Sequence, residues 1–330
     1  MHKLRILAAS VVFTVWGCNP ALAEETTESG GLRLGGYSSA SVIFHPGKRD
    51  EASLDEVSLF VSWDNNSRWR FFSEFELEQP IEWHEDESTH TRTKIDVERL
   101  YGEYDFSGLL NVRMGRFLTP IGRWNQIHAQ PLVWTTIRPL ATRQLFPLNI
   151  DGVMLSGAIA LDRAGWENHT LEYVAYAEIV RDMEKDYGEA EYKRTAGARL
   201  VLNGQADIGL SLAHFEEDTR GQPDYTLLGL DFVTGNNGWE VSGEIYRRFA
   251  QGDEGHGGYL QGVAPLSGQW SALARFESMH PSHGETTERW LVGAAWKPSV
   301  NNILKLEYVM GDEEVALSPK GFMASYAILF

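Results

Sequence analysis

The chain has 330 residues, a formal net charge of -17 and one cysteine, Cys18. Such an acidic chain is poorly suited to bind phosphate backbones, so nucleic acid is excluded as a partner. Because Cys18 lies in a segment that we expect to be removed, disulfides, thiolate catalysis and cysteine metal sites are excluded from the mature protein.

Residues 1–23 have the order of a cleavable export signal. Lys3 and Arg5 come first, an apolar run from Ile6 to Trp16 follows, and Ala21-Leu22-Ala23 precedes two glutamates. The apolar run is too short to span a bilayer as a helix, whereas the small-x-small ending is typical of a cleavage site. We therefore predict a signal peptide over residues 1–23.

The mature domain is expected to comprise residues 24–330. Removal of the signal takes away two basic residues and no acidic one, so the net charge moves from -17 to -19. A lipoprotein signal stays open as an alternative, because Val15-Trp16-Gly17-Cys18 is a partial lipoprotein box, with the bulky Trp16 where a small residue is expected.

Alternation of apolar and polar residues recurs along the whole mature chain and predicts about sixteen strands. Residues Ile95 to Glu98 are out of phase with the segment that follows them, which predicts a β-bulge there. The alternating segments are 32–44, 56–63, 69–78, 99–105, 110–115, 153–159, 171–179, 196–202, 208–214, 225–233, 239–245, 258–264, 270–276, 290–296, 304–310 and 322–330.

The connections between these segments alternate in length. Even-numbered connections are short and rich in turn residues, as in Asn203-Gly204-Gln205, while odd-numbered ones such as Pro80–Thr93 and Arg181–Tyr192 are long and mostly acidic. Short turns at one end and long loops at the other are typical of outer-membrane barrels. The predicted fold class is therefore all-β, a transmembrane antiparallel β-barrel of about 16 strands.

The two faces of the strands differ as this fold requires. Lys305 and Glu307 alternate with Leu304, Leu306 and Tyr308, so that one face is polar and the other apolar. In a barrel of this size the apolar face meets lipid and the polar face lines a wet lumen. We expect contact with outer-membrane lipid and lipopolysaccharide.

The last segment alternates from Phe322 to a terminal aromatic, Phe330. It resembles the signal by which outer-membrane barrels are recognised for insertion. Recognition by the barrel-assembly machinery and residence in the outer membrane are therefore expected.

Residues 118–150 have no two-residue rhythm, and a long irregular segment inside a regular chain is usually functional. The stretch from Phe106 to Ile150 contains five arginines and no Asp, Glu or Lys. That this loop narrows the pore is implied by the family resemblance given below. The predicted constriction residues are Arg113, Arg116, Arg123, Arg138 and Arg143, and the predicted pore-lining residues are Glu74, Glu76, Arg99 and Glu103.

Three motifs, VERLYGEYDF, LNVRMGRFLTPIGRWNQIH and WTTIRPLATRQLFP, resemble bacterial outer-membrane porins related to the phosphate-selective O/P group. The resemblance covers about Val97 to Ser156. It implies a sixteen-stranded, trimeric, general or anion-preferring porin whose third outer loop folds inward. Phosphate-selective members carry lysine ladders, and Lys is absent from Phe106 to Ile150, so phosphate specificity is not implied.

The expected function is passive diffusion of small hydrophilic solutes and ions with anion preference, without catalytic residues, cofactors or a metal site. The arginines have another interpretation, because they could pin the loop to wall carboxylates such as Glu74, Glu76, Glu103 and Asp105. Which of them remain unpaired decides the field in the pore.

Other functions remain open. Met279–Gly284 contains Ser282 and His283, which would suit a barrel-embedded hydrolase, although adjacent side chains need not converge. Loop aromatics such as Trp124 and Trp134 could form a sugar track, although packing is the commoner role. The acidic stretch 84–90 could screen cations weakly, and a structural barrel with a sealed lumen is a further alternative.

Overall fold

The computed structural model describes residues 31–46, 50–84, 94–162, 165–180, 192–217, 224–250, 253–281, 284–312 and 320–330. The predicted signal peptide at 1–23 and most of the long acidic connections lie outside these residues. Among the described residues, no helix is both long and apolar enough to cross a membrane.

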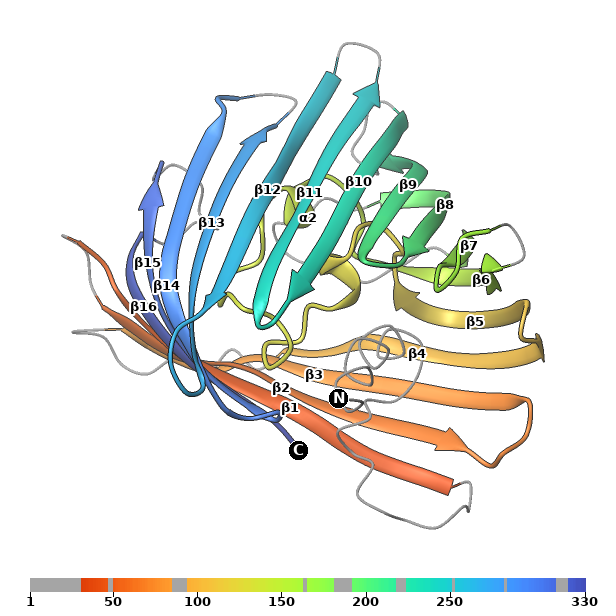
Figure 1. Ribbon diagram of the computed structural model, residues 1–330, viewed down its shortest axis with the longest axis horizontal. Coiled ribbons are helices and arrows are strands. Elements are labelled where there is room, and N and C mark those ends of the chain that lie inside the picture. The colour runs from red at the N-terminus through yellow and green to blue at the C-terminus, as the bar shows by residue number, and fades with distance from the viewer. Residues whose placement is uncertain are drawn as a thin grey trace.

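Sixteen antiparallel strands form one closed barrel, in which each strand pairs with its neighbours in sequence and the last pairs with the first (Figure 1). The predicted fold class and strand number are confirmed. The strands are β1 (Gly31–Phe44), β2 (Glu51–Asp64), β3 (Trp69–His84), β4 (Lys94–Ser107), β5 (Leu110–Leu118), β6 (Asn149–Ala160), β7 (Thr170–Val180), β8 (Tyr192–Asn203), β9 (Ala206–Glu217), β10 (Asp224–Asn236), β11 (Trp239–Ala250), β12 (Asp253–Pro265), β13 (Trp270–His280), β14 (Thr287–Ser299), β15 (Asn302–Gly311) and β16 (Gly321–Leu329).

The barrel closes between β1 and β16. Tyr37 lies opposite Leu329 in this ladder, and the backbone groups of Gly36 and Phe330 exchange two hydrogen bonds of 2.8 Å. A closed ladder leaves no strand edge with unpaired N–H and C=O groups. Closure therefore satisfies the backbone in the way that an apolar surrounding requires.

The predicted bulge is present in β4. On the neighbouring strand Glu74 pairs with Arg99 while Phe75 pairs with Val97, so Glu98 is the extra residue. A bulge re-aims side chains, because it interrupts the strict alternation between the two faces. As a result, the consecutive side chains of Glu98 and Arg99 both make contacts inside the barrel.

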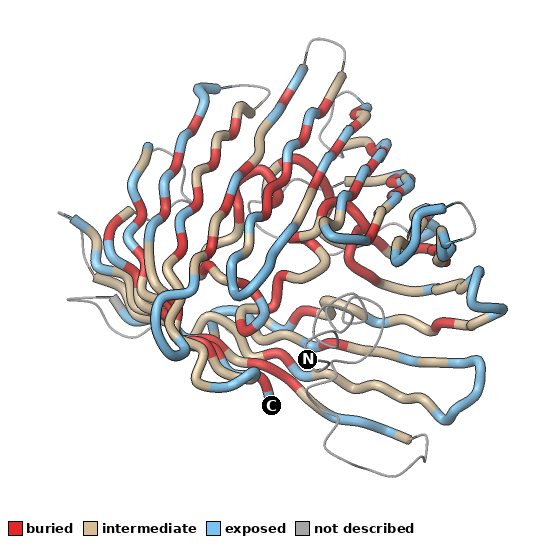
Figure 2. Tube along the Cα trace, in the orientation of Figure 1, coloured by how far each residue is buried: buried red, intermediate tan, exposed pale blue. Residues whose placement is uncertain are grey.

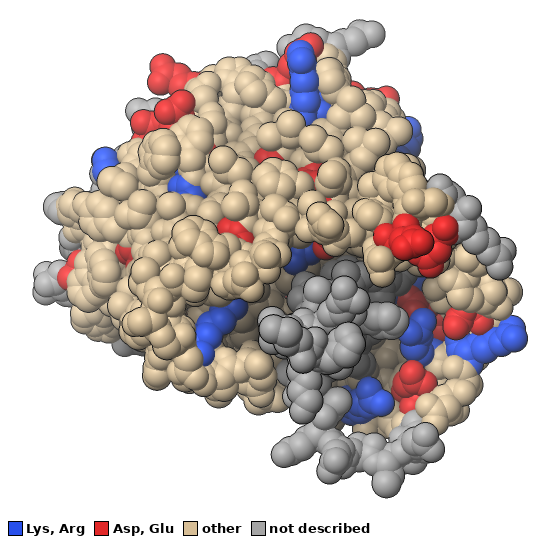
Figure 3. All heavy atoms as spheres, viewed as in Figure 1, with Lys and Arg blue, Asp and Glu red and all other residues tan. Residues whose placement is uncertain are grey.

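Burial alternates along the strands and separates two faces (Figure 2). Lys305 and Glu307 are almost fully buried, while Tyr308 and Phe322 are exposed on the outside. Most of the barrel face seen in Figure 3 is formed by uncharged residues. The outside thus has the apolar character that we predicted for a lipid-facing surface.

The segment 119–148 between β5 and β6, here called the inward loop, lies inside the ring of strands (Figure 1). Contrary to the irregular segment that we predicted, it contains two short helices, η2 (Trp124–Gln126) and α2 (Leu140–Gln144). Pro139 caps the start of α2, where its fixed φ suits helix entry and no amide hydrogen is needed. Helices this short leave no periodicity in the sequence.

Part of the inward face is apolar, which differs from the wet polar lumen that we predicted. Inward loop residues including Ile121, Leu140 and Phe146 form one buried cluster with wall residues such as Phe215 and Tyr246. The alternation identifies a face, but a folded-in loop can turn part of that face into a protein core.

Candidate functional site: the inward loop and the barrel wall

The first anchor of the inward loop is Glu244 on β11. Its Oε1 accepts the backbone N–H groups of Arg123 at 2.8 Å and of Trp124 at 2.6 Å, at the start of η2. Its Oε2 accepts the hydroxyl of Tyr246 at 2.5 Å. The Glu244 carboxylate is buried, and these donors satisfy both of its oxygens, as a buried charge requires.

A second anchor is formed by Glu277 on β13. It accepts the backbone N–H of Leu140, at the start of α2, at 2.7 Å. The guanidinium groups of Arg275 and Arg289 lie 3.1 and 2.8 Å from the same carboxylate. All three charged side chains are nearly inaccessible to solvent, so the negative charge is compensated inside the barrel.

The same arginines also hold loop carbonyls. Arg275 donates to the carbonyl oxygen of Ile137 at 2.8 Å, and Arg289 donates to that of Arg138 at 2.9 Å. Glu307 on β15 accepts the backbone N–H of Thr136 at 3.0 Å. The wall between β11 and β15 therefore fixes the loop through its backbone.

Sequence reasoning missed these anchors. They are Glu244, Glu277, Glu307, Arg275, Arg289 and Lys305. Lys305 and Glu307 stand on the predicted polar face, and a place on that face is the signal that could have singled such residues out. Each of them also contacts a backbone group of the loop, and backbone groups have no signature in a sequence.

Two of the predicted arginines belong to the wall. Arg113 donates to Glu103 at 2.7 Å and lies 4.0 Å from the ring of Tyr101, while Arg70 reaches the other oxygen of Glu103 at 2.7 Å. The expected pair between Arg113 and Glu103 is present. The positive field of Arg113 in the lumen is correspondingly reduced, because Glu103 neutralises its charge.

Arg116 pairs with Asp151 on β6 at 3.0 Å. Asp151 is not among the wall carboxylates, such as Glu103 and Asp105, that the sequence offered as possible partners of the arginines. Arg116 pairs in register with Asp151 across the ladder between β5 and β6. Cross-strand register, which sequence alone does not give, decides this choice of partner.

The remaining three predicted arginines are on the inward loop. Arg123 and Arg138 are half-buried, and Arg143 on α2 is exposed. The guanidinium of Arg138 lies 5.6 Å from the ring of Trp124. Within the described ranges, neither Arg123 nor Arg138 has a carboxylate at ion-pair distance.

The opposite wall, on β2 to β4, is acidic. Glu74 forms an ion pair with Arg99 and accepts the hydroxyl of Ser58 at 2.8 Å. Glu76 accepts the hydroxyl of Tyr37 at 3.2 Å. Of the predicted pore-lining residues, Glu74, Glu76 and Arg99 thus meet on one patch of wall, and Glu103 lies in the ion pair described above.

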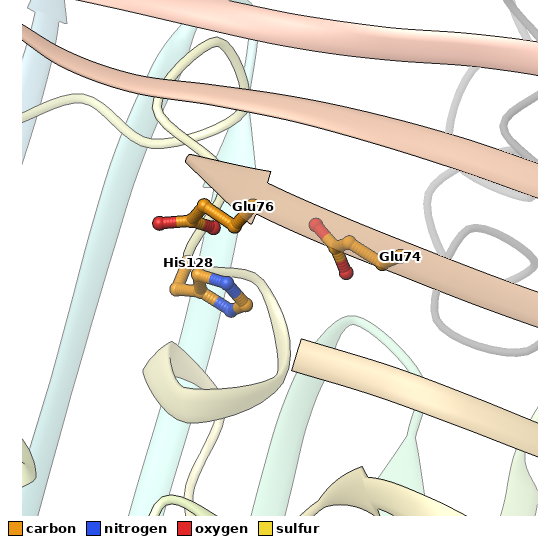
Figure 4. A group of neighbouring side chains, drawn as sticks. All are labelled: Glu74, Glu76 and His128. Carbon is orange, nitrogen blue, oxygen red and sulfur yellow. The ribbon is translucent and has the colours of Figure 1, made fainter. Parts of the chain in front are cut away.

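His128 on the inward loop faces this acidic wall (Figure 4). Its Nδ1 lies 3.3 Å from the carbonyl oxygen of Asn125, and its Nε2 lies 3.5 Å from Oε1 of Glu98. Burial, followed by the positive charge of Arg138, lowers the pKa of His128 to about 3. The imidazole is therefore neutral at pH 7, and its contact with Glu98 is not an ion pair.

The loop aromatics are mainly packed. Phe117 and Phe146 are about 1% exposed and Trp124 is 7% exposed. Trp134 is half-buried, with Nζ of Lys297 at 3.7 Å from its ring centre. Buried rings cannot stack on a sugar, so the geometry favours packing over a sugar track.

The hydrolase motif is only partly within the described residues, because Ser282 and His283 lie outside them. Met279, at the start of the motif, is buried against the inward loop. Nδ1 of His280 contacts Oγ1 of Thr286 at 3.1 Å, and its ring lies beside that of His256. These described contacts show no nucleophile activated by a base.

Comparisons with known proteins agree with the fold. No family model matches the chain. An uncharacterized protein of Aquifex aeolicus (strain VF5) is 26% identical over 252 residues, which cover 74% of this chain and 54% of that protein. The chain thus spans about half the length of this curated relative.

Several solved structures are similar. The anion-selective porin from Comamonas acidovorans is 13% identical with a TM-score of 0.62, and covers 91% of this chain and 98% of its own. OmpF of Salmonella typhi is 8% identical with a TM-score of 0.65, and the match covers 93% of this chain and 99% of that one. The outer membrane channel DcaP of Acinetobacter baumannii is 10% identical with a TM-score of 0.59, and the match covers 93% of this chain and 98% of that one. The chain has the sixteen-stranded barrel fold of outer-membrane porins.

Proposed function

We propose that this protein is an outer-membrane porin through which small hydrophilic solutes and ions diffuse passively. The observation that carries the proposal is the inward loop, which lies inside a closed barrel and is fixed to charged wall residues such as Glu244 and Glu277. A loop fixed in this way narrows a lumen to a constant size. Such a device suits a diffusion channel, since it needs no moving part.

The outer surface of the barrel supports a location in the outer membrane. The outward face is apolar, with rings such as Phe71, Trp290 and Tyr326 exposed. An apolar band with aromatic residues is the surface that outer-membrane barrels present to lipid. Export by the predicted signal, insertion by the barrel-assembly machinery and association into homotrimers belong to the same proposal.

The proposed channel prefers anions weakly. Arg113 and Arg116 on the wall are paired, whereas Arg123 and Arg138 on the inward loop have no carboxylate at ion-pair distance among the described residues, so these two contribute most to the positive field. Acidic residues farther from the constriction than the Debye length of about 8 Å are largely screened. The carboxylates of the β2–β4 wall oppose this field, and Arg138 acts electrostatically on two of them, Glu56 and Glu98.

Conductance of the purified protein in a planar bilayer tests the proposal. Stepwise, ohmic current increments with a zero-current potential on the anion side are expected. A bilayer that stays silent despite confirmed insertion supports a sealed structural barrel instead. Ester or peptide hydrolysis that is lost in Ser282→Ala and His283→Ala supports the hydrolase.

A further inference from the structure

Inside the barrel, three potential metal ligands converge from the wall and the inward loop. One carboxylate oxygen each of Glu74 and Glu76 on β3 and one ring nitrogen of His128 lie within 4.8 Å of one another. In Figure 4 the two glutamates project from one strand, with His128 beside them on the loop. His128 is far from the two glutamates in the sequence, so the folding of the inward loop against the wall creates the cluster.

The imidazole of His128 is oriented as a metal-binding histidine. Because a carbonyl oxygen can only accept, the contact of Nδ1 with Asn125 places the ring proton on Nδ1. Metal-ligating histidines commonly donate their other N–H to a backbone carbonyl in this way. The lone pair of Nε2 is then left to bind an electron acceptor.

That lone pair is buried and unsatisfied. His128 is 8% exposed, and Nε2 has no hydrogen-bond partner among the described residues. Its near neighbour is Oε1 of Glu98 at 3.5 Å, which is also an acceptor. A buried nitrogen lone pair that faces a half-buried carboxylate oxygen, without a proton or cation between them, is unfavourable.

The carboxylates have outer contacts that hold them in place. Tyr37 donates to Glu76, while Ser58 and Arg99 donate to Glu74. Hydrogen bonds to ligating carboxylates are a usual part of metal sites. Glu98, whose Oε1 lies 3.5 Å from Nε2 of His128, adds a third carboxyl group to the cluster.

We propose that Glu76, Glu74 and His128 bind a divalent transition metal ion of the Zn²⁺ type, with Glu98 as a fourth ligand. One imidazole nitrogen with carboxylate oxygens suits zinc, whereas Mg²⁺ and Ca²⁺ prefer oxygen ligands alone. Tetrahedral zinc places its ligand atoms about 3.4 Å apart, so the side chains close in by roughly one ångström on binding. The ion then joins the inward loop to the β3–β4 wall.

Zinc binding is tested by calorimetry with ZnCl₂ on the purified, detergent-solubilised protein. The surface pair His256 and His280 could bind zinc independently, so His280→Asn serves as the background. We expect one site in that background, an affinity at least about tenfold weaker after His128→Asn or Glu76→Gln, and no competition by Mg²⁺. The measurement does not depend on ion conduction, so it separates this proposal from the channel function.

X-ray absorption of the zinc-loaded His280→Asn protein provides a second readout that needs no change in the site. One imidazole with oxygen ligands is the expected environment. Absence of zinc binding at millimolar concentration, equal affinity in His128→Asn, or a spectrum with two imidazoles or with oxygen ligands only overturns the proposal. Circular dichroism checks that each variant is folded.

Discussion

Lys305 on the barrel wall holds Gln130 of the inward loop at two points. Its Nζ donates to the backbone carbonyl oxygen of Gln130 at 2.9 Å and to the side-chain Oε1 of the same residue at 2.7 Å. The same ammonium donates to the carbonyl oxygen of Thr135 at 3.1 Å. Three acceptors therefore surround one fully buried ammonium group, as its three donors allow.

Replacement of this lysine by methionine should loosen the inward loop. Lys305→Met retains most of the volume but leaves buried acceptors of Gln130 and Thr135 unsatisfied, at a cost of about 2–4 kcal/mol in unfolding free energy. We expect a lower midpoint of thermal unfolding in detergent and noisier open-channel current. The control is Lys193→Met on the outer part of β8, which should change neither.

Gly122 allows the loop to pass close to the wall. Its φ is +63°, and an added Cβ would lie 1.8 Å from the hydroxyl oxygen of Tyr246. Gly122→Ala should therefore displace the loop from Glu244 and change the conductance. Gly268 has a similar φ of +60°, but no atom lies within 4 Å of a Cβ added there. Gly268→Ala should therefore lower the unfolding free energy only by the backbone strain, about 1 kcal/mol.

Matched measurements on these two glycine variants separate crowding from strain. A larger fall in thermal midpoint for Gly122→Ala than for Gly268→Ala supports a tight loop-to-wall contact. Equal falls in thermal midpoint would show that the loop can move away from the wall at Gly122 without loss of stability.

The sequence predicted the barrel well, because the alternation of residues, the length of turns and the side of a strand on which each residue lies are local properties. It predicted about sixteen strands and a bulge in the stretch Ile95 to Glu98, where the structure has one, since a bulge breaks the alternation within a few residues. It could not predict that Arg116 pairs with Asp151, nor that Glu244 and Glu277 hold the loop. These contacts join residues far apart in the chain, and several of them end on backbone groups.

The candidate zinc ligands illustrate the same limit. Glu74 and Glu76 were predicted to line the pore, but no metal site was predicted, because His128 is some fifty positions away along the chain. Only the folded loop brings its imidazole to the wall. A lone histidine in a loop has no spacing pattern that indicates a ligand.

Closure of the barrel gives a prediction about Phe330. Deletion of this residue removes both backbone hydrogen bonds to Gly36, whereas Phe330→Ala keeps them and loses only the ring. We expect the deletion to reduce the amount of folded protein in the membrane more strongly than Phe330→Ala, with unchanged ion selectivity in the protein that does assemble. Equal, normal levels of both variants would show that closure does not depend on these bonds.

The last prediction concerns ion selectivity. Arg113 and Arg116 are held by wall carboxylates, so their substitution should affect stability more than the field in the pore. Arg123 and Arg138 lie on the inward loop without a carboxylate at ion-pair distance in the described part of the chain. Their charges act at short range between low-dielectric walls, where screening by salt is weak.

Replacing Arg123, Arg138 and Arg143 together by Gln should move the zero-current potential in a salt gradient toward cations. We expect the anion-to-cation permeability ratio to fall by roughly two- to tenfold, because the carboxylates of the β2–β4 wall then dominate the field. Arg247→Gln, whose side chain is 59% exposed near the end of β11, is the matched control and should leave the ratio unchanged. An unaltered ratio in the triple variant, with normal conductance, would mean that these arginines serve only to hold the loop.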